Sequence, residues 1–257
     1  MLKENDEARR EVNLNIWHKA GFTGKGVNVL VLDYNHKIFD WMKEYAIEID
    51  PEGKMSTGER VKNHNVYVTQ VNHEASPGAT IYVAPWTHSS DEIADWLRQN
   101  PGLIDIAGAS LGSPVSDAYD IFKELDIPFT ASSGNDYDRN RQGVNFPADL
   151  EWAISVGAYN WKDKGPYSND VVGYSNGGEK LDCVSLTNIH VQNEARNYVF
   201  EYTGTSTSRP WLTGMLACYI QWRKEQGLSK LTQAGVKEFV RVNCKDIRKN
   251  GRDYESG

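Results

Sequence analysis

Cysteine is scarce in this chain, and its spacing excludes two kinds of stabilised fold. The 257 residues include only three cysteines, and Cys183, Cys218 and Cys244 lie far apart and form no Cys-x-x-Cys pair. An odd number of scattered cysteines indicates neither a disulfide framework nor a cysteine-rich zinc site. The histidines show no His-Glu-x-x-His or comparable ligand spacing, so we expect no metal site and no cofactor.

An excess of positive charge and long apolar runs are also missing. The chain carries 28 Lys and Arg against 35 Asp and Glu, a formal net charge of -7. Because nucleic-acid affinity depends mainly on basic residues that neutralise phosphates, we expect no nucleic-acid partner. No apolar stretch could cross a bilayer, and no secretory signal follows the charged first residues. With so few cysteines, this predicts a cytoplasmic protein without a membrane partner.

Strand and helix signals alternate along the chain. Residues 27–32 form a nearly continuous apolar, β-branched run, the pattern of a strand buried on both faces. Such alternation favours a parallel sheet covered by helices on both sides. We expect further strands at residues 45–49, 80–84, 104–109, 127–131 and 152–158, and a hairpin that includes residues 198–202. Helices are expected at residues 12–20, 115–125, 211–222 and 232–243, and another is predicted to begin at a capping box, Ser89 with Glu92.

The domain organisation follows from the lack of interruptions. We find no internal repeat, low-complexity tract or linker. The sequence therefore predicts a single α/β domain over residues 1–257. Residues 1–12 are expected to be a polar N-terminal extension, and residues 245–257 a charged tail.

Three segments place a reactive side chain where a strand or loop meets a helix. Asp33 directly follows the strand at residues 27–32, at the kind of sheet edge where ligands gather. His64 begins a predicted helix, and Ser206 lies in a turn of small residues, 204–210, that leads into an apolar helix. Each has an ordinary structural explanation on its own: a turn-capping Asp, a structural His and a capped helix start.

Taken together and in this order, the three segments resemble the subtilisin-like serine proteases (subtilases, peptidase family S8). The resemblance runs from about residue 16 to residue 217, and its ordered motifs are far more specific than any single one. It implies a three-layer α/β sandwich with a mainly parallel central sheet flanked by helices. Further matches lie at residues 76–84, 110–112, 129–135, 145–148, 152–158 and 174–176.

The resemblance also implies roles for individual residues. Ser206 would be the nucleophile, His64 would accept its proton, and Asp33 would orient the imidazole and stabilise its cationic form. Asn135 would donate its side-chain amide to the oxyanion, beside the backbone N–H of Ser206.

A protein or peptide is the substrate that the resemblance implies, while the sequence identifies no regulatory partner or inhibitor. The side-chain pocket before the cut would lie between two segments, one of which would also pair with extended substrate. The first segment comprises Ser110, Leu111 and Gly112, and the second comprises Ser132, Ser133 and Gly134.

The chain departs from the family's pattern beside each of the three reactive residues. Tyr34-Asn35 follows Asp33, where Thr or Ser and then Gly are usual. His64 is followed by Asn-Val-Tyr rather than Gly-Thr-His. Thr207, Ser208 and Arg209 replace the small and apolar residues that normally follow the nucleophile. A buried charge at Arg209 would need a partner.

The resulting hypothesis is a serine endopeptidase that works through an acyl-enzyme intermediate. One alternative is a catalytically inactive scaffold that binds peptides or a partner protein, suggested by the substituted residues after His64. Another is a hydrolase of non-peptide esters or amides, since the same residues cleave both. The acidic pair Asp136 and Asp138 is interpreted as part of a solvated loop with Arg139 and Arg141.

Overall fold

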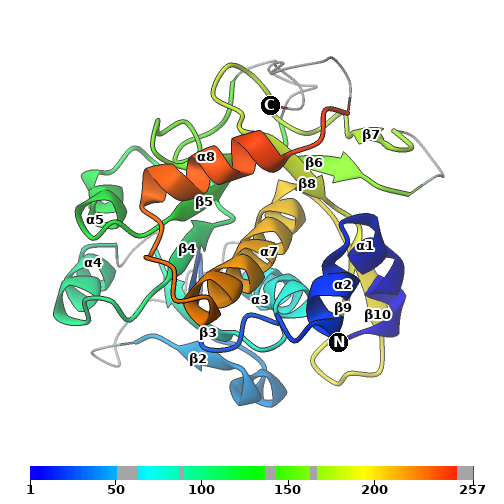
Figure 1. The fold of residues 1–257 in the computed structure, drawn as a ribbon, viewed down its shortest axis with the longest axis horizontal. Helices are drawn as coiled ribbons and strands as arrows, with labels where there is room; N and C mark the ends of the chain where they lie inside the picture. Colours follow the sequence, from blue (N-terminus) through cyan, green and yellow to red (C-terminus); the bar gives the residue numbers. More distant parts are fainter. Residues whose placement is uncertain (51–62, 87–89, 137–142, 163–166, 248–256) are drawn as a thin grey trace.

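A mainly parallel sheet forms the centre of the molecule (Figure 1). The computed structural model describes residues 1–50, 63–86, 90–136, 143–162, 167–247 and 257. The strands lie in the order β2-β3-β1-β4-β5-β6-β7, and β8 also pairs with β6. All these pairs are parallel except β6 with β7. The strands are β1 Asn28–Asp33, β2 Ala46–Glu48, β3 Thr80–Pro85, β4 Ile106–Ala109, β5 Phe129–Ser132, β6 Ile154–Asn160, β7 Asp170–Val171 and β8 Cys183–Leu186.

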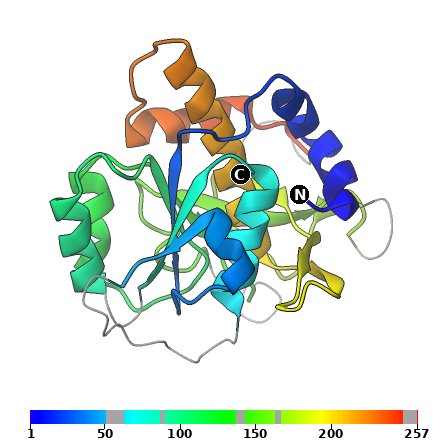
Figure 2. The same ribbon diagram turned by 90° about the horizontal axis from the view of Figure 1, so that it is seen from below.

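Helices cover both faces of this sheet, which gives three layers (Figure 2). Strand β1 shows why, since its apolar side chains alternate between the two faces of the sheet. Leu30 and Leu32 pack toward α4 and α5, whereas Val29 and Val31 pack toward α3, α7 and α8. The predicted α/β sandwich with a mainly parallel sheet is therefore confirmed. The helices are α3 His64–Ala75, α4 Ser90–Gln99, α5 Asp120–Glu124, α7 Thr205–Glu225 and α8 Gln233–Asn243.

Residues 1–12, expected as a polar extension, contain two short helices, η1 Lys3–Asn5 and α1 Asp6–Glu11. The helix predicted at residues 12–20 is present as α2 Leu14–Lys19. Ala8 and Leu14 from this segment are buried in a core that also includes Trp211 of α7. Because only a narrow apolar stripe of this segment is buried, its mainly polar composition did not predict that it packs against the core.

Several element boundaries differ from the sequence-based expectations. The helix predicted at residues 115–125 is shorter and consists of η3 Asp117–Tyr119 and α5. Helix α7 begins earlier than predicted, at Thr205, so Pro210 lies inside it. The Ser206 carbonyl, which has no N–H of residue 210 to bond, accepts the Ser110 hydroxyl instead. The predicted hairpin is present as β9 Ile189–Gln192 with β10 Val199–Tyr202, while η2 Asp40–Glu44 precedes β2. Ser89 of the predicted capping box and residues 137–142 of the predicted solvated loop lie outside the described residues.

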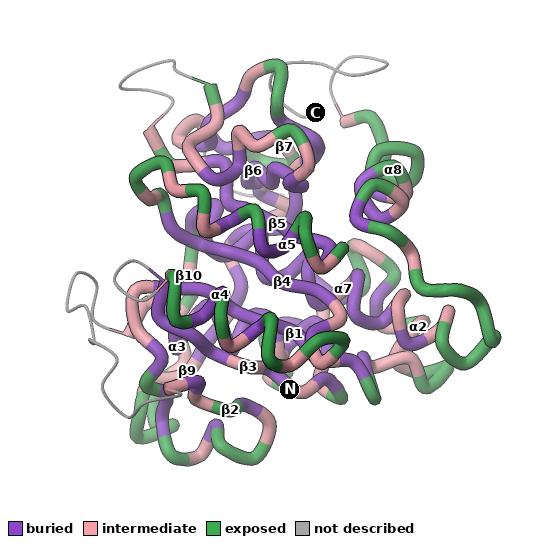
Figure 3. Tube along the Cα trace, turned by 90° about the vertical axis from the view of Figure 1, so that its left-hand side faces the viewer, coloured by how far each residue is buried: buried purple, intermediate pink, exposed green. Residues whose placement is uncertain are grey.

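Burial is concentrated in the sheet and in the first half of α7 (Figure 3). Within the described ranges, no helix is long and apolar enough to cross a membrane.

Candidate active site

Asp33 and His64 form a hydrogen-bonded pair at the carboxyl edge of the sheet. Asp33 ends β1 and is fully buried, whereas His64 is the first residue of α3. The Nδ1 atom of His64 lies 2.9 Å from Asp33 Oδ1 and 2.8 Å from Oδ2. The backbone N–H of Tyr34 also donates to Oδ1, at 2.7 Å. A proton on Nδ1 that is shared with the carboxylate leaves Nε2 as the basic nitrogen of a neutral ring.

Ser206 is the second residue of α7. The preceding Gly204 has a φ of 110°, a left-handed conformation that turns the chain from the hairpin into the helix. The Ser206 hydroxyl donates to the backbone carbonyl of Ser110 at 3.1 Å. No hydrogen bond joins it to His64 in the described part of the chain. Because Ser206 lies in the first turn, its backbone N–H has no acceptor within the helix.

Strand register brings these groups to one place. Leu32 of β1 pairs with Ala109 of β4, so Asp33 and Ser110 leave the sheet side by side. Since Ser206 contacts Ser110, it lies one strand away from the buried carboxylate of Asp33. Parallel strands present all their carboxyl ends at the same edge, which explains why residues so distant in sequence meet there.

Asn135 lies three residues beyond the end of β5, beside the start of α7. Its Oδ1 accepts hydrogen bonds from the backbone N–H and the hydroxyl of Thr205, both at 3.0 Å. A Cβ placed on Gly204 would lie 3.4 Å from Asn135 Nδ2. With Oδ1 held by Thr205, Nδ2 is the end of this exposed amide that can donate to a ligand.

The segment that follows β4 contributes little side-chain surface to this edge. Ser110 and Leu111 are each 3% exposed, and Leu111 belongs to the same hydrophobic core as Ile121 and Phe122 of α5. Gly112 is exposed. Leu111 can therefore contact a substrate only through its backbone.

The segment that follows β5 is held by backbone hydrogen bonds to neighbouring loops. Ser132 and Ser133 are buried, and Gly134 has a φ of 112°. Asn145 N–H donates to the Ser133 carbonyl at 2.8 Å, and Asn176 N–H donates to the Gly134 carbonyl at 2.9 Å. These carbonyls are already engaged, so the segment is suited to form a rigid wall rather than an added strand.

Two tyrosines flank His64 edge-on. The ring centroid of Tyr34 lies 5.9 Å from that of His64, and the centroid of Tyr202 from β10 lies at 6.1 Å. Burial raises the pKa of the Tyr202 hydroxyl well above its usual value, so this side chain remains uncharged. The sequence marked Tyr34 as a departure, but it carried no signal for Tyr202, because the hairpin reaches His64 only through tertiary packing.

Arg209 is completely buried beneath the same edge. Its Nε and Nη2 atoms donate to the hydroxyl of Ser110 at 3.0 and 2.8 Å. The partner that a buried charge here requires is thus a serine hydroxyl and not a carboxylate.

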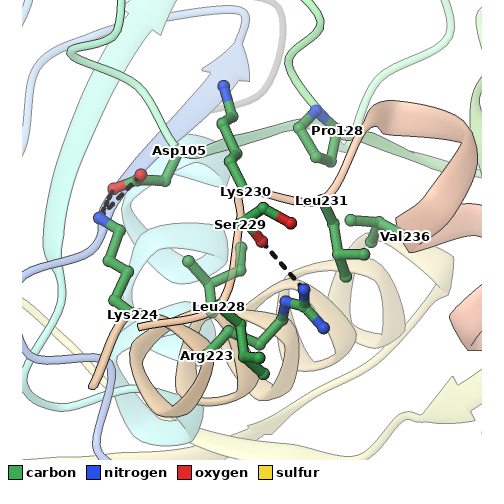
Figure 4. A pocket seen from close by; sticks show the side chains of 10 residues that line it. Asp105, Pro128, Arg223, Lys224, Leu228, Ser229, Lys230, Leu231 and Val236 are labelled. Atoms are coloured by element: carbon green, nitrogen blue, oxygen red, sulfur yellow. Dashed lines mark hydrogen bonds and ion pairs between the residues drawn. The ribbon is translucent and has the colours of Figure 1, made fainter. Parts of the chain in front are cut away.

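A cavity of about 120 Å³ lies at the opposite edge of the sheet (Figure 4). Its lining includes Asp105 and Pro128, which directly precede β4 and β5 at the amino ends of the strands. Lys224 pairs with Asp105 at 2.8 Å on its rim. This cavity is therefore separate from the Asp33, His64 and Ser206 edge. Among the described residues, no group of His, Cys, Asp and Glu is arranged to hold a metal ion.

Comparison with solved structures supports the architecture. A lanthipeptide protease aligns with a TM-score of 0.72 at 16% identity, over 96% of this chain and 92% of that one. The prenylagaramide maturation protease PagA aligns at 0.69 and 18% identity, over 95% and 92% of the two chains. A cold-adapted subtilisin-like serine proteinase aligns at 0.69 and 17% identity, over 91% and 88%. At these identities the likeness concerns the fold alone.

Comparison of the sequence itself is more specific. A search of curated proteins found no match. The model of the subtilase family, however, matches residues 58–257, which include the segments that carry His64, Asn135 and Ser206. Most of the chain is covered by this match, and the fold agrees with it, so the chain belongs to the subtilase family of peptidases.

Proposed function

We propose that this chain is a serine endopeptidase that cleaves peptide bonds through an acyl-enzyme intermediate. The observation that carries the proposal is the Asp33–His64 pair at the sheet edge where Ser206 lies in the first turn of α7. This is the arrangement that a serine hydroxyl needs, because the hydroxyl is a weak nucleophile until a neighbouring base accepts its proton.

The reaction begins when the Ser206 hydroxyl leaves the Ser110 carbonyl and turns to His64 Nε2. Its oxygen attacks the substrate carbonyl carbon as the proton moves to Nε2, and Asp33 stabilises the resulting imidazolium. The negative oxygen of the tetrahedral intermediate accepts hydrogen bonds from the Ser206 backbone N–H and Asn135 Nδ2. The proton on Nε2 then passes to the leaving amine. Water, activated by the same imidazole, releases the acyl group from Ser206.

A peptide is the substrate class that the site and the family support. Among the similar structures are a maturation protease, a lanthipeptide protease and the PatG macrocyclase in complex with peptide. Extended substrate would pair with the segment 110–112, where Gly112 exposes its backbone, and segment 132–134 would form the facing wall. The three free cysteines support a cytoplasmic location as part of this proposal.

The second candidate function is a peptide-binding scaffold without catalysis. It is favoured by the resting hydrogen bond of the Ser206 hydroxyl, which goes to Ser110 rather than to His64. In such a scaffold this bond would persist when a peptide binds, and no covalent intermediate would form.

Covalent labelling with a fluorophosphonate separates the two functions. We expect the probe to phosphonylate Ser206, as located by peptide mass spectrometry, and the chain to cleave a mixed peptide library. Ser206→Ala should abolish both, a loss on the order of a millionfold in rate. Ser208→Ala is the matched control, because Ser208 is also a buried serine of the first turn, and its hydroxyl donates to the Gly204 carbonyl at the start of the same helix. An unlabelled, correctly folded wild-type chain would contradict the proposal.

A further inference from the structure

The Arg209 side chain fills a buried space against the central sheet. The side chain is 0% exposed and lies between the first turn of α7 and strands β4 and β5. Gly108 of β4 makes room for two side chains: a Cβ there would clash with Thr130 Oγ1 and would lie 2.7 Å from Arg209 Nη1 and 3.0 Å from Cδ. A side chain at position 108 would therefore compete with both the Thr130 hydroxyl and the guanidinium.

Ser110 connects this guanidinium to Ser206 in two ways. Its hydroxyl receives hydrogen bonds from Nε and Nη2 of Arg209 and donates to the Ser206 backbone carbonyl at 3.2 Å. Its own backbone carbonyl accepts the Ser206 hydroxyl. A shift of the Ser110 side chain would therefore move both the backbone and the hydroxyl of Ser206.

The charge of Arg209 is not neutralised by contact. Its Nη1 has no hydrogen-bond partner among the described residues, and its ionisation is influenced through space by Asp33 of β1 and Tyr202 of β10. Burial lowers the pKa of Arg209 to about 9, which leaves it cationic at neutral pH. A buried cation without a contacting anion is costly. An apolar side chain at this position would avoid that cost, so packing alone does not account for an arginine here.

We propose that Arg209 is a positioning residue for Ser206, acting through the two hydrogen bonds that immobilise Ser110. This inference rests on the proposed peptidase function and concerns the same site. Arginine suits the role because two N–H groups of its planar guanidinium can donate to one oxygen in a fixed geometry. Lysine has a single ammonium on a flexible chain. Arg209 itself touches no substrate.

The second-order rate of fluorophosphonate labelling tests this role in the full chain. The probe carries no peptide, so a change in rate cannot come from lost pairing with the segment 110–112. We expect Arg209→Met to lower the rate roughly ten- to hundredfold, because small displacements of reacting groups have effects of that size. The melting temperature should stay the same or rise, since an apolar side chain removes the buried charge. Arg223→Met, on the same helix beside the opposite cavity, should keep the wild-type rate.

Ser110→Ala is the second variant, and it removes the hydroxyl that connects Arg209 to Ser206. It should lower the labelling rate by a similar factor, and Arg209→Met should then have little further effect, because both changes interrupt one path. With a cleavable peptide, Arg209→Met should lower kcat and change KM by less than about twofold, as expected for a residue that does not bind substrate.

The outcomes distinguish this inference from the function on which it depends. A wild-type chain that does not label contradicts the peptidase function. If wild type and Arg209→Met label at the same rate, only the role of Arg209 is contradicted. The same holds if the labelling rate of the double variant, Ser110→Ala with Arg209→Met, falls by the product of the two single factors. If Arg209→Met does not fold, Ser110→Ala decides: a wild-type rate in that variant overturns the proposal.

Discussion

Two buried arginines, far apart in the sequence, are held in very different ways. Arg9 of α1 is 4% exposed and contacts two carboxylates, Glu74 at 2.8 Å and Asp6 at 2.7 Å. Arg209 of α7 is fully buried, yet the hydrogen bonds of its guanidinium within the described ranges all go to the hydroxyl of Ser110.

The surroundings of the two arginines explain the difference. Arg9, Asn5 and Glu74 form what we call the N-terminal brace, in which Asn5 bonds Glu74 and also both backbone groups of His190. The brace holds the first helices against α3 and β9. The positive charge of Arg9 is neutralised by the carboxylates that it contacts. At the sheet edge that carries Ser206, by contrast, Asp33 is paired with His64, so the charge of Arg209 is not neutralised by that carboxylate. A buried charge that is neutralised by contact serves stability, whereas an unneutralised one beside reactive groups points to function.

Of the changes that test this comparison, Asp33→Asn, at the sheet edge above Arg209, should produce the largest effect. The amide no longer stabilises the imidazolium and favours the wrong ring tautomer, so we expect the labelling rate to fall about 10,000-fold. Labelling kinetics at neutral pH measure this loss. Asp6→Asn, the corresponding change beside Arg9, should leave the rate unchanged. A loss smaller than about tenfold for Asp33→Asn would remove Asp33 from the proposed mechanism.

Arg9→Met should show the opposite behaviour, with lost stability and an unchanged rate. The substitution leaves the Glu74 carboxylate buried without its cation, so we expect the free energy of unfolding to fall by about 3 kcal/mol. Urea unfolding measures this change, and Arg10→Met is the control because Arg10 is exposed on the same helix. If Arg9→Met slowed labelling of the folded chain as much as Arg209→Met, the contrast between the two arginines would be lost.

His73, which lines a cavity together with Glu74 of the brace, should make stability depend on pH. Its ring stacks on Tyr45 with centroids 3.7 Å apart, and burial lowers its pKa to about 4. The unfolded chain binds a proton below about pH 6.5 and the folded chain only near pH 4, so stability decreases as the pH falls between these values. From pH 7 to pH 5, this group should cost the wild type roughly 2 kcal/mol.

His73→Gln should remove that part of the pH dependence. We would compare urea unfolding of the two chains at both pH values. Equal losses of stability in wild type and variant would show that His73 is not responsible.

Local sequence patterns were sufficient for the elements that carry the site. The apolar run before Asp33 predicted β1, His64 was expected to begin a helix, and the turn of small residues at Ser206 was expected to lead into another, which in fact begins within that turn, at Thr205. These features depend on neighbours within a few residues, which is why periodicity and capping preferences detect them. The short helices before residue 12 were missed because their buried stripe is interrupted by charged residues such as Arg9.

The sequence by itself determined the fold class, the order of the reactive residues and the strand and helix ends on which they lie. The partners of those residues were decided only by tertiary structure. Packing directs the Leu111 side chain into the core, brings Tyr202 to His64, and joins Arg209 to a hydroxyl 99 residues away. The physical reason is that hydrophobic patterns report which face of an element is buried, whereas strand register and helix docking decide what that face meets.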